Sequence, residues 1–280
     1  MTARNIKQAW QAVDTSDGAG VNLKRALGSA PGLRMDPYLM LDNFSSDNPD
    51  DYIAGFPAHP HRGFETVTYI VDGHMQHKDH LGNQGDLRAG GVQWMLAGKG
   101  IIHEEMPQQE NGLLRGFQIW LNLPAKDKMQ PAFYKDVPAA DMPWQALNDQ
   151  AEIKLIAGSL AADKQELLPL ADRDTQPIIA DLNLKAGGGL SLNLPSAHQV
   201  LVYVFEGEAE IAGQQLKIAT AATLTDGDKL EVNSATGARV LLLTGKPLNE
   251  PIAQYGPFVM NTQEEINQAI NDYRTGQLTA

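Results

Sequence analysis

Four side chains in the N-terminal half of the sequence could together bind a metal ion. His59 and His61 lie two residues apart in "FPAHPHRGFETVTYIVDG", and His103 and Glu105 repeat this spacing in "AGGVQWMLAGKGIIHEEM". On a β-strand, side chains at this spacing point to the same face, about 7 Å apart along the chain. Neutral imidazole and carboxylate suit divalent first-row metals, so two facing pairs would supply four ligands. On an octahedral metal they would leave two adjacent positions for substrate or dioxygen.

Glu65 is a rival to Glu105 for the carboxylate position. It follows His61 at the start of "FETVTYIV", and counted along a continuous strand it faces the same side as the histidines. Periodicity alone therefore leaves both glutamates open as ligands. An isolated His-x-His pair is more often an ordinary surface or core feature. The second pair, which follows a glycine-rich segment, favours a metal site.

The elements that must position these residues read as short β-strands. Runs such as "FETVTYIV", "GFQIWLNL", "QVLVYVFEG" and "ARVLLLTG" are separated by turns rich in the 26 glycines and 16 prolines. Regular short strands with turn signals between them predict an all-β sandwich or barrel. Only the C-terminus looks helical, because Thr262 and Glu265 form a capping box ahead of "EEINQAINDYRTGQ" and Gly276 is a plausible stop.

The sequence falls into two β-rich halves. The segment "PAKDKMQPAFYKDVPAADMPWQ", rich in proline and polar residues, reads as a connector between them. "TYIVDGHMQHKD" in the first half is echoed by "VYVFEGEAEIAG" in the second, which suggests a duplicated unit. We therefore expect a metal-binding domain over residues 1–135 and a second domain over residues 136–280 that includes the C-terminal helix.

Composition excludes several classes of protein. The 280 residues include no cysteine, so disulfides, thiolate metal sites and a cysteine nucleophile are ruled out. The 34 acidic and 22 basic residues give a net charge of −12, which argues against direct binding of nucleic acid. No apolar run of about 18 residues occurs, and "MTARNIKQAW" lacks the apolar core of a signal peptide. We expect a cytoplasmic protein with no membrane contact.

Several longer motifs resemble the pirin family of the cupin superfamily. They are "AGFPAHPHRGFETVTYIVDG", "HKDHLGN", "LRAGGVQWMLAGKGIIHEEMP", "DPYLMLDNF", "GFQIWLNLP" and "GPFVMNTQEEINQAINDY". The resemblance runs from about residue 20 to the end of the chain. It implies a bicupin: two tandem antiparallel β-barrels, each a double-stranded β-helix, with the metal in the N-terminal barrel.

The resemblance also implies a ligand set. Pirins bind iron, as Fe(II) or Fe(III), with three histidines and one glutamate, which fall here on His59, His61, His103 and Glu105. The general cupin pattern would instead place its glutamate at Glu65. The pirin resemblance favours Glu105 and leaves Glu65 as an outer acceptor that orients a ligand ring. We expect one iron per chain, although other divalent first-row metals suit the same ligands.

The other histidines are expected to serve ordinary structural roles. His74, His77 and His80 lie in a hairpin and turn, where their spacing does not share one strand face. His77 is the exception, because the pirin pattern has a histidine at this place, and we expect it near the ligands. His198 stands where a second metal motif would begin, but Val200 follows instead of a histidine. The second domain is therefore expected to be free of metal.

The resemblance implies two alternative functions. As an enzyme, the protein would cleave a flavonol such as quercetin with dioxygen, and Glu105 would take the proton of the substrate hydroxyl. As a regulator, it would bind a partner protein in response to the oxidation state of its iron. A planar aromatic substrate would suit a barrel mouth lined by some of the nearby aromatic and apolar residues, although most of these are expected in the core: Phe56, Phe64, Trp94, Met95 and Phe117.

Overall fold

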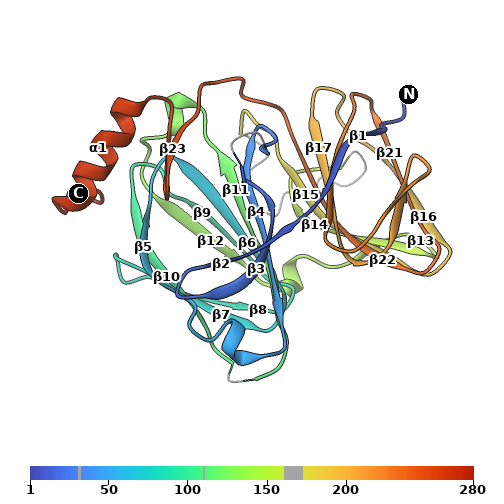
Figure 1. Ribbon diagram of the computed structural model, residues 1–280, viewed down its shortest axis with the longest axis horizontal. Coiled ribbons are helices and arrows are strands. Elements are labelled where there is room, and N and C mark those ends of the chain that lie inside the picture. Colours follow the sequence, from blue (N-terminus) through green and yellow to red (C-terminus); the bar gives the residue numbers. More distant parts are fainter. Residues whose placement is uncertain (31–32, 110, 161–172) are drawn as a thin grey trace. The chain divides into compact units, whose positions relative to one another are not determined.

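The computed structural model describes residues 1–280 except 31–32, 110 and 161–172. The chain is mostly β-strand and forms two compact units (Figure 1). The first, here called the site unit, consists of Asp14–Arg25, Tyr38–Ala139 and Leu248–Ala280. The second, the companion unit, consists of Met1–Val13, Ala26–Pro37 and Ala140–Pro247.

The site unit is built from a seven-stranded sheet in the order β12-β9-β6-β11-β4-β3-β2 and a four-stranded sheet in the order β5-β10-β7-β8. Two further short strands, β23 and β24, pair with each other and lead into the helix α1. The bounds of its elements are β2 (Val13–Asp17), β3 (Val21–Leu27), β4 (Tyr38–Ser46), η1 (Pro49–Asp51), β5 (Phe56–His61), β6 (Phe64–Asp72), β7 (His74–Asp79), β8 (Gln84–Arg88), β9 (Val92–Leu96), β10 (Ile101–Pro107), β11 (Leu114–Asn122), η2 (Ala125–Asp127), β12 (Phe133–Val137), β23 (Ala253–Tyr255), β24 (Phe258–Met260) and α1 (Gln263–Arg274).

The companion unit repeats this plan. Its seven-stranded sheet has the order β1-β20-β17-β22-β15-β14-β13, and its four-stranded sheet has the order β16-β21-β18-β19. The bounds are β1 (Ile6–Gln11), η3 (Ala139–Asp141), β13 (Gln145–Asn148), β14 (Ala151–Ala157), β15 (Ile178–Leu184), β16 (Gly188–Asn193), β17 (Gln199–Gly207), β18 (Ala209–Ile211), β19 (Gln214–Leu216), β20 (Thr220–Leu224), β21 (Lys229–Ser234) and β22 (Ala238–Gly245). The echoed motifs lie on β6–β7 and β17–β18, at matching places in the two plans, as expected for a duplicated unit.

The interiors of the two units differ in chemistry. In the companion unit, β16 and β21 take the places that β5 and β10 occupy in the site unit. These two strands contribute Leu190, Leu192, Leu230 and Val232 to one large apolar cluster. By strand order, β16 with its leucines therefore matches β5 with its histidines. Val200, which the sequence analysis took as the missing ligand, lies on β17 and not on this strand. The expectation that this unit holds no metal stays a prediction.

The helix begins and ends as the sequence predicts. The Thr262 hydroxyl accepts the Glu265 amide at 3.2 Å, and the Glu265 carboxylate accepts the Thr262 amide at 3.0 Å. Gly276, with a φ of 72°, follows the last turn. These bonds satisfy amide groups that would otherwise lack partners at the start of α1.

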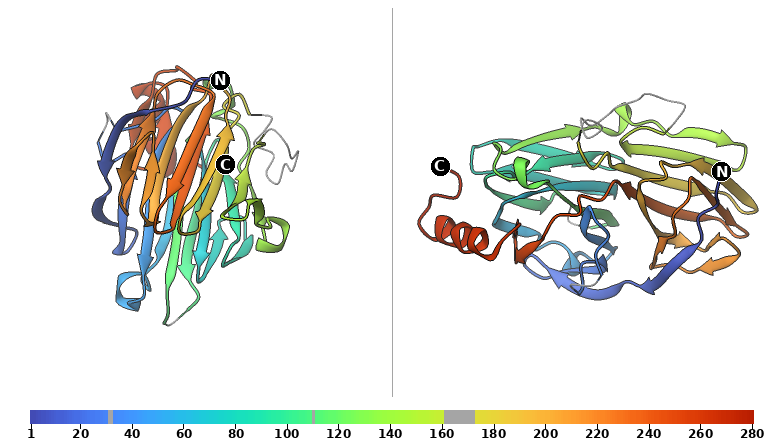
Figure 2. Two further views of the ribbon diagram at one scale, coloured as in Figure 1. Left: turned by 90° about the vertical axis from the view of Figure 1, so that its right-hand side faces the viewer. Right: turned by 90° about the horizontal axis from the view of Figure 1, so that it is seen from above.

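The terminal segments differ from the expected division into two contiguous domains. Figures 1 and 2 show α1, in red, beside strands of the site unit, to which residues 248–280 belong. The apolar side of α1, with Ile266 and Ala269, packs with Phe258, Met260 and Ile102 of that unit. Through this packing α1 belongs to the site unit, most of which comes from the N-terminal half of the sequence. The first strand, β1, conversely pairs with β20 of the companion unit.

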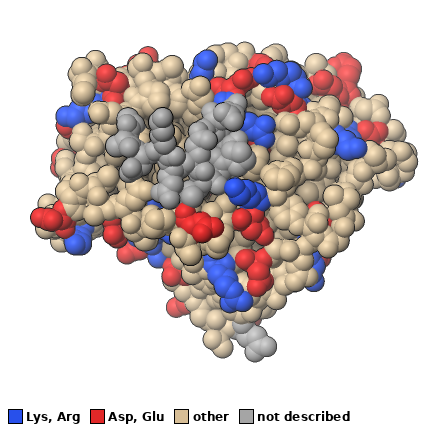
Figure 3. All heavy atoms as spheres, turned by 180° about the vertical axis from the view of Figure 1, so that it is seen from behind, with Lys and Arg blue, Asp and Glu red and all other residues tan. Residues whose placement is uncertain are grey.

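The hydrophobicity of the helices and the charge on one face of the surface bear on two of the expectations from composition. The described residues form no helix long and apolar enough to cross a membrane. On the face drawn in Figure 3, acidic and basic side chains are interspersed, and no continuous basic patch is visible there.

Candidate metal centre

Three histidines converge where β5 and β10 pair antiparallel. His59 is the direct cross-strand partner of His103, and His61 is the partner of Ile101. The ring centroids are 4.7 Å apart for His59 and His61, 4.4 Å for His59 and His103, and 4.9 Å for His61 and His103. Each ring offers a ligand nitrogen, and these three atoms all lie within 4.8 Å of one another. The spacing of two residues thus brings His59 and His61 to one face, as predicted.

Two prolines help to explain the place of β5 in its sheet. Pro57 and Pro60 lie within β5, which is an edge strand of the four-stranded sheet. Proline lacks an amide proton and is tolerated on edge strands, where one side of the strand needs no ladder partner. The two histidines are therefore presented from a strand that pairs on one side only, with β10.

Glu105 joins this cluster from β10. The pairing of β10 with β5 has an irregularity between His103 and Glu105, and on its other side Glu105 is the cross-strand partner of His77 on β7. His77, His103 and Glu105 form a second group whose ligand atoms all lie within 4.8 Å of one another. Because His103 belongs to both groups, the structure brings all four predicted ligand residues together with His77. Among the described residues, these are the two groups that could hold a metal ion.

Hydrogen bonds leave ring nitrogens of two histidines free for a metal. His59 Nδ1 lies 2.8 Å from the carbonyl oxygen of Pro57. A carbonyl only accepts, so Nδ1 carries a proton, and Nε2 is the ring nitrogen that can offer a lone pair to a metal. His103 Nδ1 contacts His77 Nδ1 at 3.2 Å, while His103 Nε2 is buried without a hydrogen-bond partner in the described part of the chain. A buried lone pair without a partner is costly unless a ligand occupies it.

Burial favours the neutral form of three of the imidazoles, those of His61, His77 and His103. His61, His77 and His103 are each at most 3% exposed. Burial lowers the pKa of His61 well below its usual value; His59 acts in the same direction, and the backbone of Pro257 opposes it. Burial also lowers the pKa of His103 well below its usual value, and that of His77 to about 4. Neutral imidazole is the form that binds metal, so the site is prepared for a cation.

Glu105 is held in a buried position by a neighbouring strand. Burial raises the pKa of Glu105, whereas His59 and the hydrogen bond from Thr68 lower it. The Thr68 hydroxyl on β6 lies 3.2 Å from Glu105 Oε1 and 2.5 Å from Gln118 Oε1 on β11. A carboxylate in such a place is stabilised by a nearby cation, and its raised pKa makes it a better proton acceptor than an exposed glutamate.

Glu65 does not join the cluster. Thr68 faces Glu105, and residues that alternate along β6 point to opposite faces, so Glu65 lies on the other side of the sheet from Thr68. It is fully buried there, next to its cross-strand partners Leu96 and Leu121. The count along one continuous strand fails because β5 ends at His61 and β6 begins after Gly63, whose φ is 88°. The expectation that both glutamates face the metal is wrong.

Aromatic rings border the histidines on the sheet side. Trp120 on β11 and Phe64 on β6 contact each other at 4.3 Å between ring centroids, and both contact the His61 ring, at 5.3 and 5.1 Å. Trp120 is partly exposed, whereas Phe64 is fully buried. Phe117 and Trp94 are buried core residues, as expected. Sequence reasoning missed Trp120, although the alternation of "GFQIWLNL" puts it on one face with Gln118.

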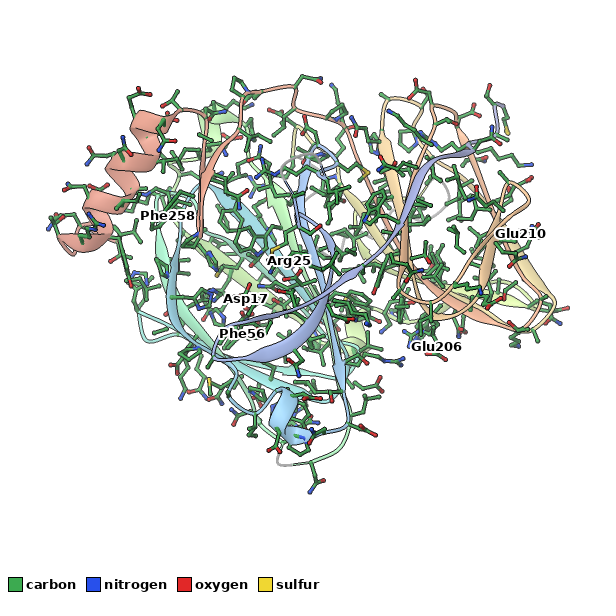
Figure 4. The ribbon with its side chains drawn as sticks, viewed as in Figure 1. Asp17, Arg25, Phe56, Glu206, Glu210 and Phe258 are labelled. Carbon is green, nitrogen blue, oxygen red and sulfur yellow. The ribbon has the colours of Figure 1, made fainter. Side chains whose placement is uncertain are left out.

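Polar side chains continue across the same face of the seven-stranded sheet. Gln118 is the cross-strand partner of both Thr68 on β6 and Asp42 on β4, so the three share one face. Arg25 binds both carboxylate oxygens of Asp42, at 2.8 and 2.7 Å, and also contacts Asp17 at 2.9 Å (Figure 4). These contacts link polar side chains on β2, β3 and β4 to the face of the sheet that carries Thr68.

The remaining histidines lie outside the cluster, as expected. His74 Nε2 pairs with Asp86 at 2.9 Å, and His80 Nδ1 accepts the Ile102 amide at 3.4 Å. His198, in the companion unit, pairs with the Thr244 hydroxyl at 2.7 Å. His77, in contrast, lies beside His103, where the sequence analysis expected it.

The residues present fit a divalent metal. Neutral imidazoles with available lone pairs, a carboxylate and a buried nitrogen without a partner are what a first-row metal site requires. His59, His61, His103 and Glu105 could hold the ion, with His77 behind His103.

The chain is similar to known proteins along most of its length. The family model Pirin matches residues 20–121, and the model of the Pirin C-terminal cupin domain matches residues 179–279. The chain is 51% identical over 279 residues to a protein of Pseudomonas aeruginosa named "Putative quercetin 2,3-dioxygenase", covering 98% of each chain. It is 35% identical over 271 residues to human pirin, covering 94% of this chain and 90% of that one.

Solved structures give the same result. A crystal structure of quercetin 2,3-dioxygenase from Acinetobacter baumannii matches with a TM-score of 0.92 and 35% identity, covering 100% of this chain and 99% of that one. A bacterial pirin of Escherichia coli in complex with nickel(II) shares the fold, with a TM-score of 0.66 and 18% identity over 86% of this chain and 99% of that one. With both family models and close relatives matching along its length, the chain belongs to the pirin family of cupin proteins.

Proposed function

We propose that this protein is a metal-dependent dioxygenase that opens the heterocycle of a flavonol such as quercetin. The observation that carries the proposal is the convergence of three histidines, whose ligand nitrogens lie within 4.8 Å of one another, beside the buried Glu105. The names of the relatives from Pseudomonas aeruginosa and Acinetobacter baumannii support the substrate class. We further propose that the two main sheets of each unit form the β-barrel typical of cupins.

Iron, as Fe(II) or Fe(III), is the proposed metal, at one ion per chain. His59, His61, His103 and Glu105 would hold it. The nickel(II) complex of the Escherichia coli pirin makes other divalent first-row metals candidates as well. A bound metal would supply Lewis acidity, which stabilises the deprotonated 3-hydroxyl of a flavonol.

Glu105 is the proposed proton acceptor. Its buried carboxylate has a raised pKa and lies beside the histidines, so it can accept the proton that leaves the substrate hydroxyl. The Thr68 hydroxyl orients it through Oε1. The partly exposed ring of Trp120, next to His61, offers an aromatic surface for a planar substrate. Dioxygen is then the oxidant, and the heterocycle opens with loss of carbon monoxide.

The test is an aerobic turnover assay on iron-loaded protein. Metal-free protein is loaded with Fe(II) without air, its iron content is measured, and quercetin and air are then added. We expect quercetin to be consumed with release of carbon monoxide, and Glu105→Gln to lose this activity. The proposed dioxygenase activity is contradicted if protein that holds one iron per chain releases no more carbon monoxide than the metal-free control. That result would favour the alternative, an iron-dependent regulator that binds a protein partner.

A further inference from the structure

The C-terminal segment of the chain holds the loop that follows the ligand His61. Arg62, the next residue, is 4% exposed, and its backbone exchanges hydrogen bonds with this segment. Its amide donates to the carbonyl of Pro257 at 3.3 Å, and its carbonyl accepts the amide of Val259 at 3.0 Å. Strand β24 therefore runs beside residue 62 as a parallel bridge partner.

The guanidinium of Arg62 extends this attachment to α1 and the chain end. Nη1 binds Asp272 on α1 at 2.7 Å, and Nη2 binds the carbonyl of Leu278 at 3.3 Å. Nε binds the carbonyl of Lys99, just before β10, which carries His103. One buried side chain thus joins both ligand strands to the C-terminal segment. Buried guanidinium groups are stable only when their donors are satisfied in this way.

A buried lysine holds the other side of the same loop. Lys128 is 1% exposed, and its ammonium donates to the carbonyl of Gly63 at 2.8 Å, to Asn122 Oδ1 at 2.7 Å and to the carbonyl of Val259 at 3.1 Å. The three bonds use all three donors of the ammonium group. Lys128 therefore joins the loop after His61 to β24.

The backbones approach so closely that two glycines are required. A Cβ added to Gly63 would lie 2.0 Å from the carbonyl oxygen of Val259, and one added to Gly100 would lie 2.3 Å from that of Leu278. Ile102, the neighbour of His103, packs against an apolar cluster of this segment that consists of Phe258, Met260, Ile266, Ala269 and Leu278 (Figure 4 labels Phe258). The C-terminal segment thus packs against the loops next to two of the three histidines.

We propose that Arg62 and Lys128 are positioning residues through which the C-terminal segment, residues 257–280, sets the metal affinity of the histidine site. Neither residue offers a ligand atom to the cluster. They hold the backbone from which His61 and His103 project, and so preserve the spacing at which their nitrogens meet one ion. Ligands held less firmly must be ordered by the metal itself, which weakens binding. The inference rests on the proposed metal site.

The test uses Co(II), whose visible absorption bands report ligand geometry, titrated without air into full-length metal-free protein. Arg62→Met and Lys128→Met each remove the three side-chain hydrogen bonds of the residue replaced. Asp272→Asn keeps the shape of the side chain and replaces the charged partner of Arg62 with a neutral amide. Asp72→Asn is the matched control, because Asp72 pairs with Arg115 at 2.8 Å away from the ligands. Thermal unfolding of each metal-free variant separates general destabilisation from a loss confined to the site.

Arg62→Met and Lys128→Met should bind Co(II) about 10–100-fold more weakly and with shifted bands. Asp272→Asn should weaken binding several-fold, and Asp72→Asn should bind as the unaltered protein does. If Arg62→Met or Lys128→Met fails to fold, Asp272→Asn decides. The positioning role is overturned if Asp272→Asn, and each of the other two variants that folds, binds Co(II) with the affinity and the absorption bands of the unaltered protein. That result would leave the proposed metal site standing. Failure of the unaltered protein to bind Co(II) would overturn the metal site together with this inference.

Discussion

His103 and His77 meet through their Nδ1 atoms, which lie 3.2 Å apart in the buried interior of the site unit. Because burial lowers the pKa of both rings, each is neutral, so one Nδ1 donates and the other accepts. If His103 gives its Nε2 lone pair to a metal, its Nδ1 must carry the proton and donate to His77. His77 would then select the metal-binding tautomer of His103 without contacting the ion itself.

Replacing His77 should therefore weaken metal binding without abolishing it. His77→Phe keeps a ring at this place but removes the acceptor, which leaves the His103 Nδ1 proton buried without a partner. We expect Fe(II) affinity to fall about 10–100-fold, whereas His103→Ala should lose most of the metal. His74→Phe is the control, because His74 lies on the same strand and pairs with Asp86. A competition titration with a coloured chelator measures the affinities. A loss in His77→Phe as complete as in His103→Ala would instead make His77 a ligand.

Replacing Thr68 should change the pH dependence of turnover. The Thr68 hydroxyl lowers the pKa of Glu105, so Thr68→Val should raise that pKa. If deprotonated Glu105 is the base, the acid limb of the pH profile should move to higher pH. One hydrogen bond of about 1 kcal/mol corresponds to roughly 0.7 pH units. Thr66→Val, on the same face of β6, is the control, and its profile should not move. An unchanged acid limb in Thr68→Val would argue against this role of Glu105.

The companion unit should show an acid sensitivity that is independent of metal. Burial lowers the pKa of His198 to about 4, with Arg4 and Lys246 acting in the same direction. Between pH 6.5 and 4, His198 is protonated in the unfolded chain but stays neutral in the folded chain. The free energy of unfolding therefore falls as the pH falls. The slope from one such group is at most about 1.4 kcal/mol per pH unit.

His198→Gln removes this titration and should flatten the dependence. Urea unfolding of metal-free protein at pH 7 and pH 5 measures it, and the stability difference between the two pH values should be smaller in the variant. An equal difference in both proteins would show that His198 is not a source of the acid sensitivity.

Local patterns in the sequence predicted the parts of the site that depend on one continuous element. His59 and His61 share a face because β5 runs unbroken through both, and α1 begins at its capping box because that signal is local. Counting along one continuous strand misplaces Glu65 because a turn at Gly63 changes the face. At Gly63 the backbone lies against Val259, about 200 residues away in the chain, and no local pattern shows this contact.

Long-range relationships explain the other differences. No local pattern predicts that α1 packs in the site unit, because its apolar side could pack against many surfaces. In the companion unit the strand that matches β5 carries leucines, so no polar pattern marks it, and His198 lies instead in the adjacent turn. The equivalence of the two strands follows from the order of the strands in their sheets.

The identity of the carboxylate ligand is the most direct test of the metal site. Glu105→Gln and Glu65→Gln are matched, because both residues are buried glutamates on strands of the same unit, but only Glu105 lies in the histidine cluster. Metal-free forms of both variants are titrated with Fe(II) in the absence of air. We predict that Glu105→Gln loses at least 10-fold in affinity, because the anion that offsets the metal charge is gone, while Glu65→Gln keeps substantial metal. Tight binding by Glu105→Gln together with loss of binding by Glu65→Gln would contradict the ligand set proposed here.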